Sequence, residues 1–159
     1  MELLKKGTAV KTVYDLDMIK TINLFEQVTH ARVKEAFYMK DVLTFIVLEG
    51  DKFKALGKNL SNLHKMEQML SKKVKIVEFD SDITKFITNL IYPYRVESVV
   101  LNDKIVTITD SDNKTKGLII GAKAQNLRMY EGIVKKYFEI EEIKVLWNFM
   151  FYGTNYFLK

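Results

Sequence analysis

The chain has 159 residues, and its 48% hydrophobic content can fill the core of one medium-sized domain or two small ones. It contains no cysteine and only two histidines, which excludes disulfides, thiolate metal sites and histidine-rich metal centres. The net charge of +5 favours an anionic partner. Without a signal-peptide pattern or a run of about 18 apolar residues, we expect a cytoplasmic protein.

The first predicted helix follows an N-terminal arm of residues 1–13. Either Asp15 or Asp17 can cap this helix, because a short carboxylate side chain accepts hydrogen bonds from the first free amides. The apolar residues that recur on one face at the helical period are Met18, Ile22 and Phe25. This periodicity predicts a helix that packs on a core.

A hairpin, two helices and a closing strand are predicted next. The β-rich runs VKEAFYM and VLTFIVL, residues 33–39 and 42–48, are joined by Lys40-Asp41, which is short enough for a hairpin. A brief helical segment then leads to Gly57 and an amphipathic helix. The run KVKIVEF, residues 73–79, closes this half of the chain as a strand.

The same succession is predicted a second time. The segment ITKFITNLIY forms a helix that Asp82 can cap and Pro93 ends. VESVVL and KIVTIT, joined at Asn102-Asp103, read as a hairpin whose second strand alternates between apolar and polar residues. A short helix, Gly121, a long helix and the strand IKVLW follow. The apolar face of that long helix comprises Leu127, Tyr130, Val134, Tyr137 and Phe138.

The two halves are copies of one unit. When Arg32–Phe79 is aligned with Arg95–Leu146, Gly57 meets Gly121. Each glycine begins the pattern Gly, four residues, Asn-Leu, three residues, Glu. Chance does not account for a spacing that holds over so long a stretch. The predicted domains are residues 14–79 and 80–147, followed by an aromatic tail at 148–159.

This order of elements, with a glycine turn between two helices, resembles a type II KH domain present twice, as in archaeal NusA-like transcription factors. The matching segments are INLFEQVTHARVKEAF, ALGKNLSNLHKMEQMLSKKVKIVEF and KGLIIGAKAQNLRMYEGIVKKYF. The resemblance covers residues 15–146. It implies an α+β fold of two tandem type II KH domains and binding of single-stranded RNA during transcription elongation or termination, without a cofactor or enzyme activity.

KH domains carry Gly-x-x-Gly between the two helices, where backbone amides hold the nucleic-acid backbone. The copies read Gly57-Lys58-Asn59-Leu60 and Gly121-Ala122-Lys123-Ala124, so each keeps the first glycine and a lysine but lacks the second glycine. Ala124 adds only a methyl group beside a phosphate, whereas Leu60 is bulky. The resemblance implies these RNA-binding candidates: Gly57, Lys58, Asn59, Lys116, Gly121, Ala122, Lys123, Ala124 and Arg128.

Simpler interpretations of these features stay open. The glycine turns can be helix-turn-helix geometry without a ligand, and the lysines can belong to solvated helix faces. In another class of function, the degenerate loops no longer bind RNA and the chain is a scaffold that docks RNA polymerase or a ribosomal partner. The aromatic tail either continues the last strand into the core or forms the docking patch for such a partner.

Two Asp-Ser-Asp sequences, beginning at Asp80 and Asp110, suggest a metal loop at first sight. A calcium loop from Asp110 would need glycine at its sixth position and glutamate at its twelfth, where Thr115 and Gly121 stand. We therefore expect turn and cap roles for these acids, and no metal site. Neither a P-loop nor a nucleophile with a base can be assembled, which favours a function other than catalysis.

Overall fold

The computed structural model describes residue 4 and residues 12–147. Contacts divide the chain into two compact units, residues 4–90 and residues from 91 onward, called below the first and the second unit. The sequence places the domain boundary between residues 79 and 80, whereas the contacts place it between residues 90 and 91. The helix between these two boundaries therefore groups with the first unit. The predicted tail 148–159 and most of the predicted arm 1–13 lie outside the described residues.

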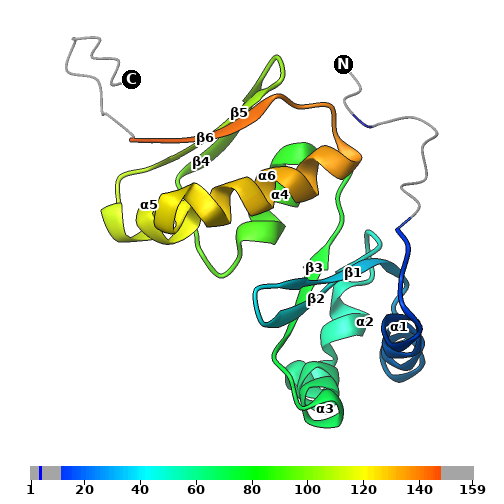
Figure 1. Ribbon diagram of the computed structural model, residues 1–159. Coiled ribbons are helices and arrows are strands. Elements are labelled where there is room, and N and C mark those ends of the chain that lie inside the picture. Colours follow the sequence, from blue (N-terminus) through cyan, green and yellow to red (C-terminus); the bar gives the residue numbers. More distant parts are fainter. Residues whose placement is uncertain (1–3, 5–11, 148–159) are drawn as a thin grey trace, which may run out of the picture. The chain divides into compact units, whose positions relative to one another are not determined.

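The first unit contains a three-stranded sheet of order β1-β2-β3, with β1 antiparallel and β3 parallel to β2. Helices α1, α2 and α3 contact this sheet or one another (Figure 1). Its elements are α1 (Leu16–Thr29), β1 (Val33–Met39), β2 (Val42–Val47), α2 (Lys52–Leu56), the 3-10 turn η1 (Lys58–Leu60), α3 (Ser61–Leu70), β3 (Val74–Glu78) and α4 (Ile83–Ile91).

Of the two predicted caps of the first helix, Asp15 is the one that caps it. Its carboxylate accepts a hydrogen bond from the Met18 amide at 2.8 Å. The helix ends at Thr29, and the next residue, His30, adopts a left-handed conformation and donates its amide to the Glu26 carbonyl. The expected capping chemistry therefore fixes the start of the helix.

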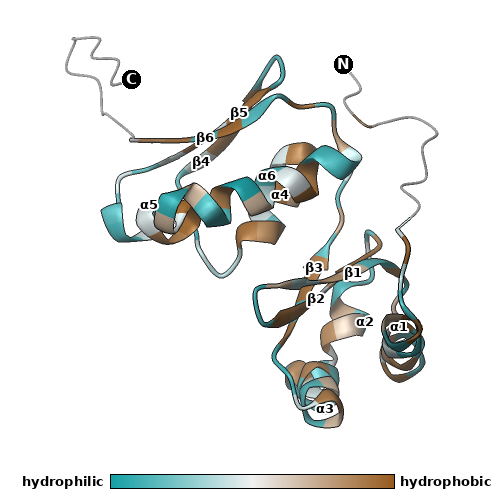
Figure 2. Cartoon of the chain, viewed as in Figure 1, coloured by the Kyte–Doolittle hydropathy of each residue, from teal (hydrophilic) through white to brown (hydrophobic). Residues whose placement is uncertain are grey.

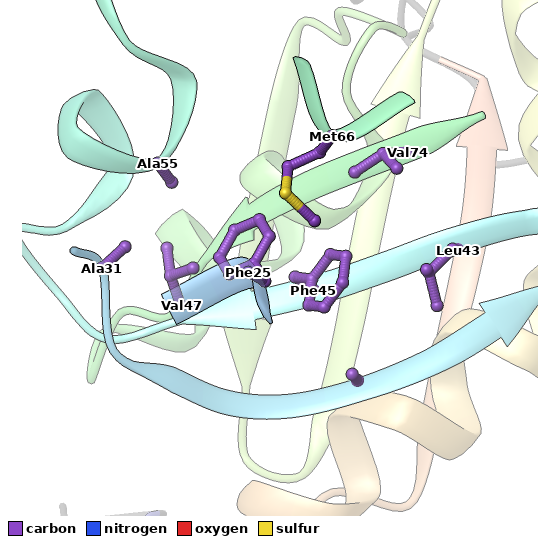
Figure 3. Packing of buried hydrophobic residues seen from close by; sticks show 9 residues of the cluster. Phe25, Ala31, Leu43, Phe45, Val47, Ala55, Met66 and Val74 are labelled. Atoms are coloured by element: carbon purple, nitrogen blue, oxygen red, sulfur yellow. The ribbon is translucent and has the colours of Figure 1, made fainter. Parts of the chain in front are cut away.

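The core of the first unit is built around two stacked phenylalanine rings. Phe25 of α1 and Phe45 of β2 lie 4.0 Å apart between ring centroids and are nearly parallel, with Met66 of α3 beside them (Figure 3). On the opposite side of β2, Thr44 and Ile46 are also fully buried. Both faces of this strand are therefore covered, which suits its mostly hydrophobic sequence (Figure 2).

Two polar side chains connect α4 to β3. Lys75 donates to the Leu90 carbonyl at 2.6 Å, and the Asn89 amide group donates to the Glu78 carbonyl at 3.1 Å. Burial lowers the pKa of Lys75 to about 8, because the surroundings disfavour its charged form. These bonds attach α4 to the first unit, with which it groups, through side chains distant in sequence.

The second unit repeats the arrangement, with sheet order β4-β5-β6, an antiparallel pair and a parallel pair. Its hairpin turns at Asp103-Lys104, one residue later than predicted, since Asn102 still pairs with Ile105. Helices α5 and α6 pack on the sheet (Figure 1). Its elements are β4 (Ser98–Asn102), β5 (Ile105–Asp110), α5 (Asn113–Ile120), the 3-10 turn η2 (Ala122–Ala124), α6 (Gln125–Tyr137) and β6 (Glu142–Trp147).

Strand β5 follows the alternation expected of a half-buried strand. Val106 and Ile108 are buried on one side, and Thr107 and Thr109 are half-buried on the other. With two small three-stranded sheets and helices packed on them, the described chain is α+β and consistent with a KH-like fold.

Truncation of Phe25 to alanine is expected to destabilise the protein by about 3–5 kcal/mol, because it removes a fully buried ring and leaves a cavity against Phe45. Phe53→Ala is the matched control, since that ring is 83% exposed, and it should change the unfolding free energy by less than about 0.5 kcal/mol. Urea denaturation measures both. Equal effects of the two substitutions would contradict this assignment of the core.

Candidate nucleic-acid interface

Gly57 and Gly121 join the two helices of each unit in the same backbone conformation. Their φ and ψ angles are 73° and 168° in the first unit, and 72° and 174° in the second. Glycine alone occupies this region readily. A Cβ atom would also lie 2.7 Å from Ser61 Oγ at Gly57, and 2.6 Å from Asn126 Cγ at Gly121. Both positions therefore require glycine for the fold itself.

The asparagine of the repeated pattern occupies the space that the missing Cβ leaves. Asn126 donates from Nδ2 to the Leu118 carbonyl at 2.9 Å, and Asn62 makes the equivalent bond to the Lys54 carbonyl at 2.9 Å. Each bond bridges the glycine turn and satisfies a carbonyl in the last turn of the preceding helix. The recurrence was visible in the sequence, but this role was not.

Two left-handed residues complete each loop. The φ angles are 53° at Asn59 and 61° at Leu60, and 54° at Lys123 and 59° at Ala124. Such a conformation costs a residue with a Cβ about 1–2 kcal/mol. Leu60 and Ala124 stand where the Gly-x-x-Gly pattern has its second glycine. The two loops therefore keep one backbone path although neither has that glycine.

The glutamate of the repeated pattern attaches the long helix of each unit to the closing strand. Glu67 Oε1 accepts a hydrogen bond from the Val74 amide at 3.1 Å, and Glu131 Oε2 accepts one from the Ile143 amide at 3.0 Å. The pairing fixes where β3 and β6 begin relative to α3 and α6. Asparagine and glutamate in the repeat thus have structural roles.

Glu131 also organises two nearby cations. Arg128 lies 2.7 Å and Lys135 3.0 Å from its carboxylate, which is nearly buried. Burial acts to raise the pKa of Glu131, but hydrogen bonds from the Ile143 amide and Lys135, with the charges of Lys135 and Arg128, outweigh it and lower the pKa. The carboxylate is therefore held in its charged form.

The basic candidates differ in their exposure. Lys58 and Lys123 are exposed in the loops, and neither joins an ion pair among the described residues. The Arg128 side chain is 54% exposed although its guanidinium is engaged. Lys116, predicted to flank the site, is only 5% exposed in α5, because it lies three residues before the buried Ile119 and shares its face.

The helices that follow the loops start without a side-chain cap. Leu60 and Ala124 occupy the N-cap positions of α3 and α6, and neither side chain accepts a hydrogen bond. In contrast, α1 and α5 are capped by Asp15 and Asp112. The first-turn amides of α3 and α6, together with the helix dipole, are suited to an anion beside an exposed lysine.

The Asp-Ser-Asp sequences form turns and caps, as predicted. Asp80 and Asp110 each accept the amide of the residue two positions later at 2.7 Å, and Asp112 caps α5 through the Thr115 amide at 2.9 Å. Within residues 12–147, no group of three or more acidic or histidine side chains is placed to hold a metal ion. No helix in that range is long and apolar enough to cross a membrane.

Comparisons with known proteins identify the family. A protein of Methanocaldococcus jannaschii named probable transcription termination protein NusA is 30% identical over 131 residues, which cover 80% of this chain and 72% of that protein. The protein of that name from Methanococcus vannielii is 30% identical over 132 residues, covering 80% and 76%. The chain belongs to the archaeal NusA family. A protein of the same name from Thermoplasma acidophilum is 21% identical over 134 residues.

Membership in the NusA family confirms the resemblance found in the sequence. A solved structure described as APE1850 has the same fold, with a TM-score of 0.60 and 23% identity, over 84% of this chain and 100% of that one. No family model matches the sequence.

Replacing the loop glycine and replacing a helical glycine of the same unit are expected to change the stability of the protein in opposite directions. Gly121→Ala should destabilise the protein by about 2 kcal/mol or more, because the new methyl group meets Asn126 and the backbone is strained. Gly132→Ala in α6 should instead stabilise by about 0.5–1 kcal/mol, since open space surrounds that position. Thermal and urea unfolding measure both changes. If Gly121→Ala leaves the stability unchanged, the turn does not require glycine.

The lowered pKa of Glu131 predicts a specific loss of stability in acid. The contribution is complete above the ordinary pKa of 4.5 and is lost as the pH falls through the lower folded value. Glu131→Gln should reduce stability at pH 7 and flatten the fall in unfolding free energy below about pH 4.5. Glu139→Gln, at an exposed position, is the control. If both variants follow the wild-type pH profile, Glu131 does not carry this effect.

Proposed function

We propose that the chain is an RNA-binding transcription factor of elongation or termination, built from two tandem type II KH domains. Its relatives are named for transcription termination, and none of those names denotes an enzyme. The order α-β-β-α-α-β in each copy, with one antiparallel and one parallel strand pair, supports the type II assignment. Counting α4 as the first helix of the second domain gives the boundary at residue 80.

The observation that carries the proposal is the matched pair of loops. Each presents an exposed lysine, Lys58 or Lys123, in the turn that leads to a helix whose N-cap residue offers no acceptor. Charge, free space and helix amides are thereby brought to one place in both copies. A phosphate group of a single RNA strand satisfies all three, because it is anionic and accepts several hydrogen bonds.

The second loop is the better phosphate site of the two. Ala124 adds only a methyl group at the entrance of α6, and Arg128 follows one turn later with its side chain 54% exposed. In the first loop the corresponding Leu60 projects 43% of its surface into solvent. We therefore assign backbone contact to Gly121–Ala124 with added charge from Lys123 and Arg128, and leave the buried Lys116 outside the interface.

The partners that follow from this proposal are a single RNA strand, such as a nascent transcript or ribosomal RNA, and RNA polymerase. Phosphate contacts supply affinity without reading sequence, so the two loops alone give sequence-tolerant binding. Residues 12–147 offer no metal-binding cluster for such contacts, and lysine and amide groups supply the required positive potential.

The decisive substitution is Lys123→Glu. Binding of single-stranded RNA should weaken as salt rises, and loss of one phosphate contact should reduce the log–log salt slope by about 0.7. Fluorescence anisotropy of a labelled RNA of about 12 nucleotides measures the slope over a salt series. Lys20→Glu in α1 makes the same change of charge at an exposed position that belongs to neither loop.

Equal weakening by Lys20→Glu and Lys123→Glu would indicate an effect of net charge rather than a loop contact. If wild-type protein and Lys123→Glu both fail to bind at low salt, the RNA-binding proposal is wrong. The scaffold function would then account for the loops, and recovery of RNA polymerase or ribosomal proteins by the intact chain would test it.

A further inference from the structure

Phe53 is the most exposed aromatic residue in the part of the chain that the structure describes, with 83% of its surface accessible. It belongs to α2, whereas its neighbour two positions on, Ala55, is fully buried in the core. The Phe53 carbonyl accepts the Gly57 amide at 2.9 Å, so the ring lies one helical turn before the loop. Packing within the first unit does not require an aromatic residue at this position.

Positive charge flanks the exposed ring. Lys54, next in sequence, has a side chain that is 56% exposed and shares the Asp51 carboxylate with Arg32, its Nζ lying 3.5 Å from Asp51 Oδ1, and Lys58 is exposed at the start of the loop. The nearby carboxylate of Asp51 is only 4% exposed, and Arg32 binds it at 3.0 Å, which lowers its pKa and compensates its charge. The surface around Phe53 is therefore an apolar ring among cations.

The position of the second unit that corresponds to Phe53 carries no ring. Gly117 stands four residues before Gly121, and its carbonyl accepts the Gly121 amide at 2.8 Å, but it has no side chain. A Cβ atom at Gly117 would meet nothing within 4 Å, so the fold tolerates a side chain there. The difference between the copies thus lies on the surface, where it changes what each loop can contact.

We propose that Phe53 is a stacking platform for a base of single-stranded RNA, so that the first unit contributes base stacking while the second contributes phosphate contacts. This inference rests on the proposed function and extends it to a named residue. A flexible nucleic-acid strand presents a flat apolar base beside a negative backbone, which matches a ring between Lys54 and Lys58. A purely apolar protein partner would gain nothing from these lysines.

Affinity measurements with variants of Phe53 test the inference on the intact chain. Phe53→Ala should weaken binding of a single-stranded RNA of about 12 nucleotides by between about fivefold and about 150-fold. The same factor should appear at every salt concentration, since stacking releases no counterions, whereas Lys123→Glu changes the slope. Met69→Ala in α3, another exposed apolar position of the first unit, should leave affinity unchanged.

Two further variants separate stacking from simple apolar contact. Phe53→Trp should retain affinity, while Phe53→Leu should behave like Phe53→Ala, because leucine has no π-face. Trp147 is the chain's only tryptophan, so Phe53→Trp combined with Trp147→Phe places a single fluorophore at the site. Its emission should be quenched when RNA is added.

The outcomes distinguish this inference from the function on which it rests. If wild-type protein binds RNA with the expected salt slope but Phe53→Ala and Phe53→Leu bind equally well, Phe53 is not a stacking platform and the proposed function stands. Binding without quenching of the tryptophan variant would overturn the inference in the same way. Absence of any salt-dependent RNA binding by the wild type would overturn both.

Discussion

The backbone conformation of Gly57 and Gly121 is the constraint on which both units depend. At these residues the chain leaves one helix and enters the next through a region of φ and ψ that side chains disfavour. Because no Cβ is present, Asn62 and Asn126 can reach back across the turn to the preceding helix. In both units the turn leads to a helix that starts without a side-chain cap, and it carries an exposed lysine.

The two copies agree where side chains hold the fold and differ where they meet solvent. Glycine, asparagine and glutamate recur with the same hydrogen bonds, as Glu67 and Glu131 illustrate. On the surface, Phe53 corresponds to Gly117, and the bulky Leu60 to Ala124. A duplicated scaffold can specialise in this way at little cost in stability, because exposed positions contribute little to the core. The unequal roles proposed for the two loops rest on these surface differences.

Family membership and local chemistry support the functional proposal from separate directions. Relatives named for transcription termination place the chain among archaeal NusA proteins, and similarity of fold alone would not define a site. The loops add a physical reason for an anionic ligand, since Lys58 and Lys123 precede helix starts that lack caps. Neither loop needs its missing second glycine to keep the backbone path, so that departure alone does not argue against binding.

The sequence by itself determined the elements, the repeat and the glycine turns, because hydrophobic periodicity, caps such as Asp15 and glycine requirements act over a few residues. Only the tertiary structure decided that Lys116 is buried and that Glu131 binds the amide of Ile143, twelve residues away. It also decided that the Phe53 ring remains in solvent although Ala55 of the same helix is buried. Such outcomes depend on which elements pack together, and the periodicity of a single element does not contain that information.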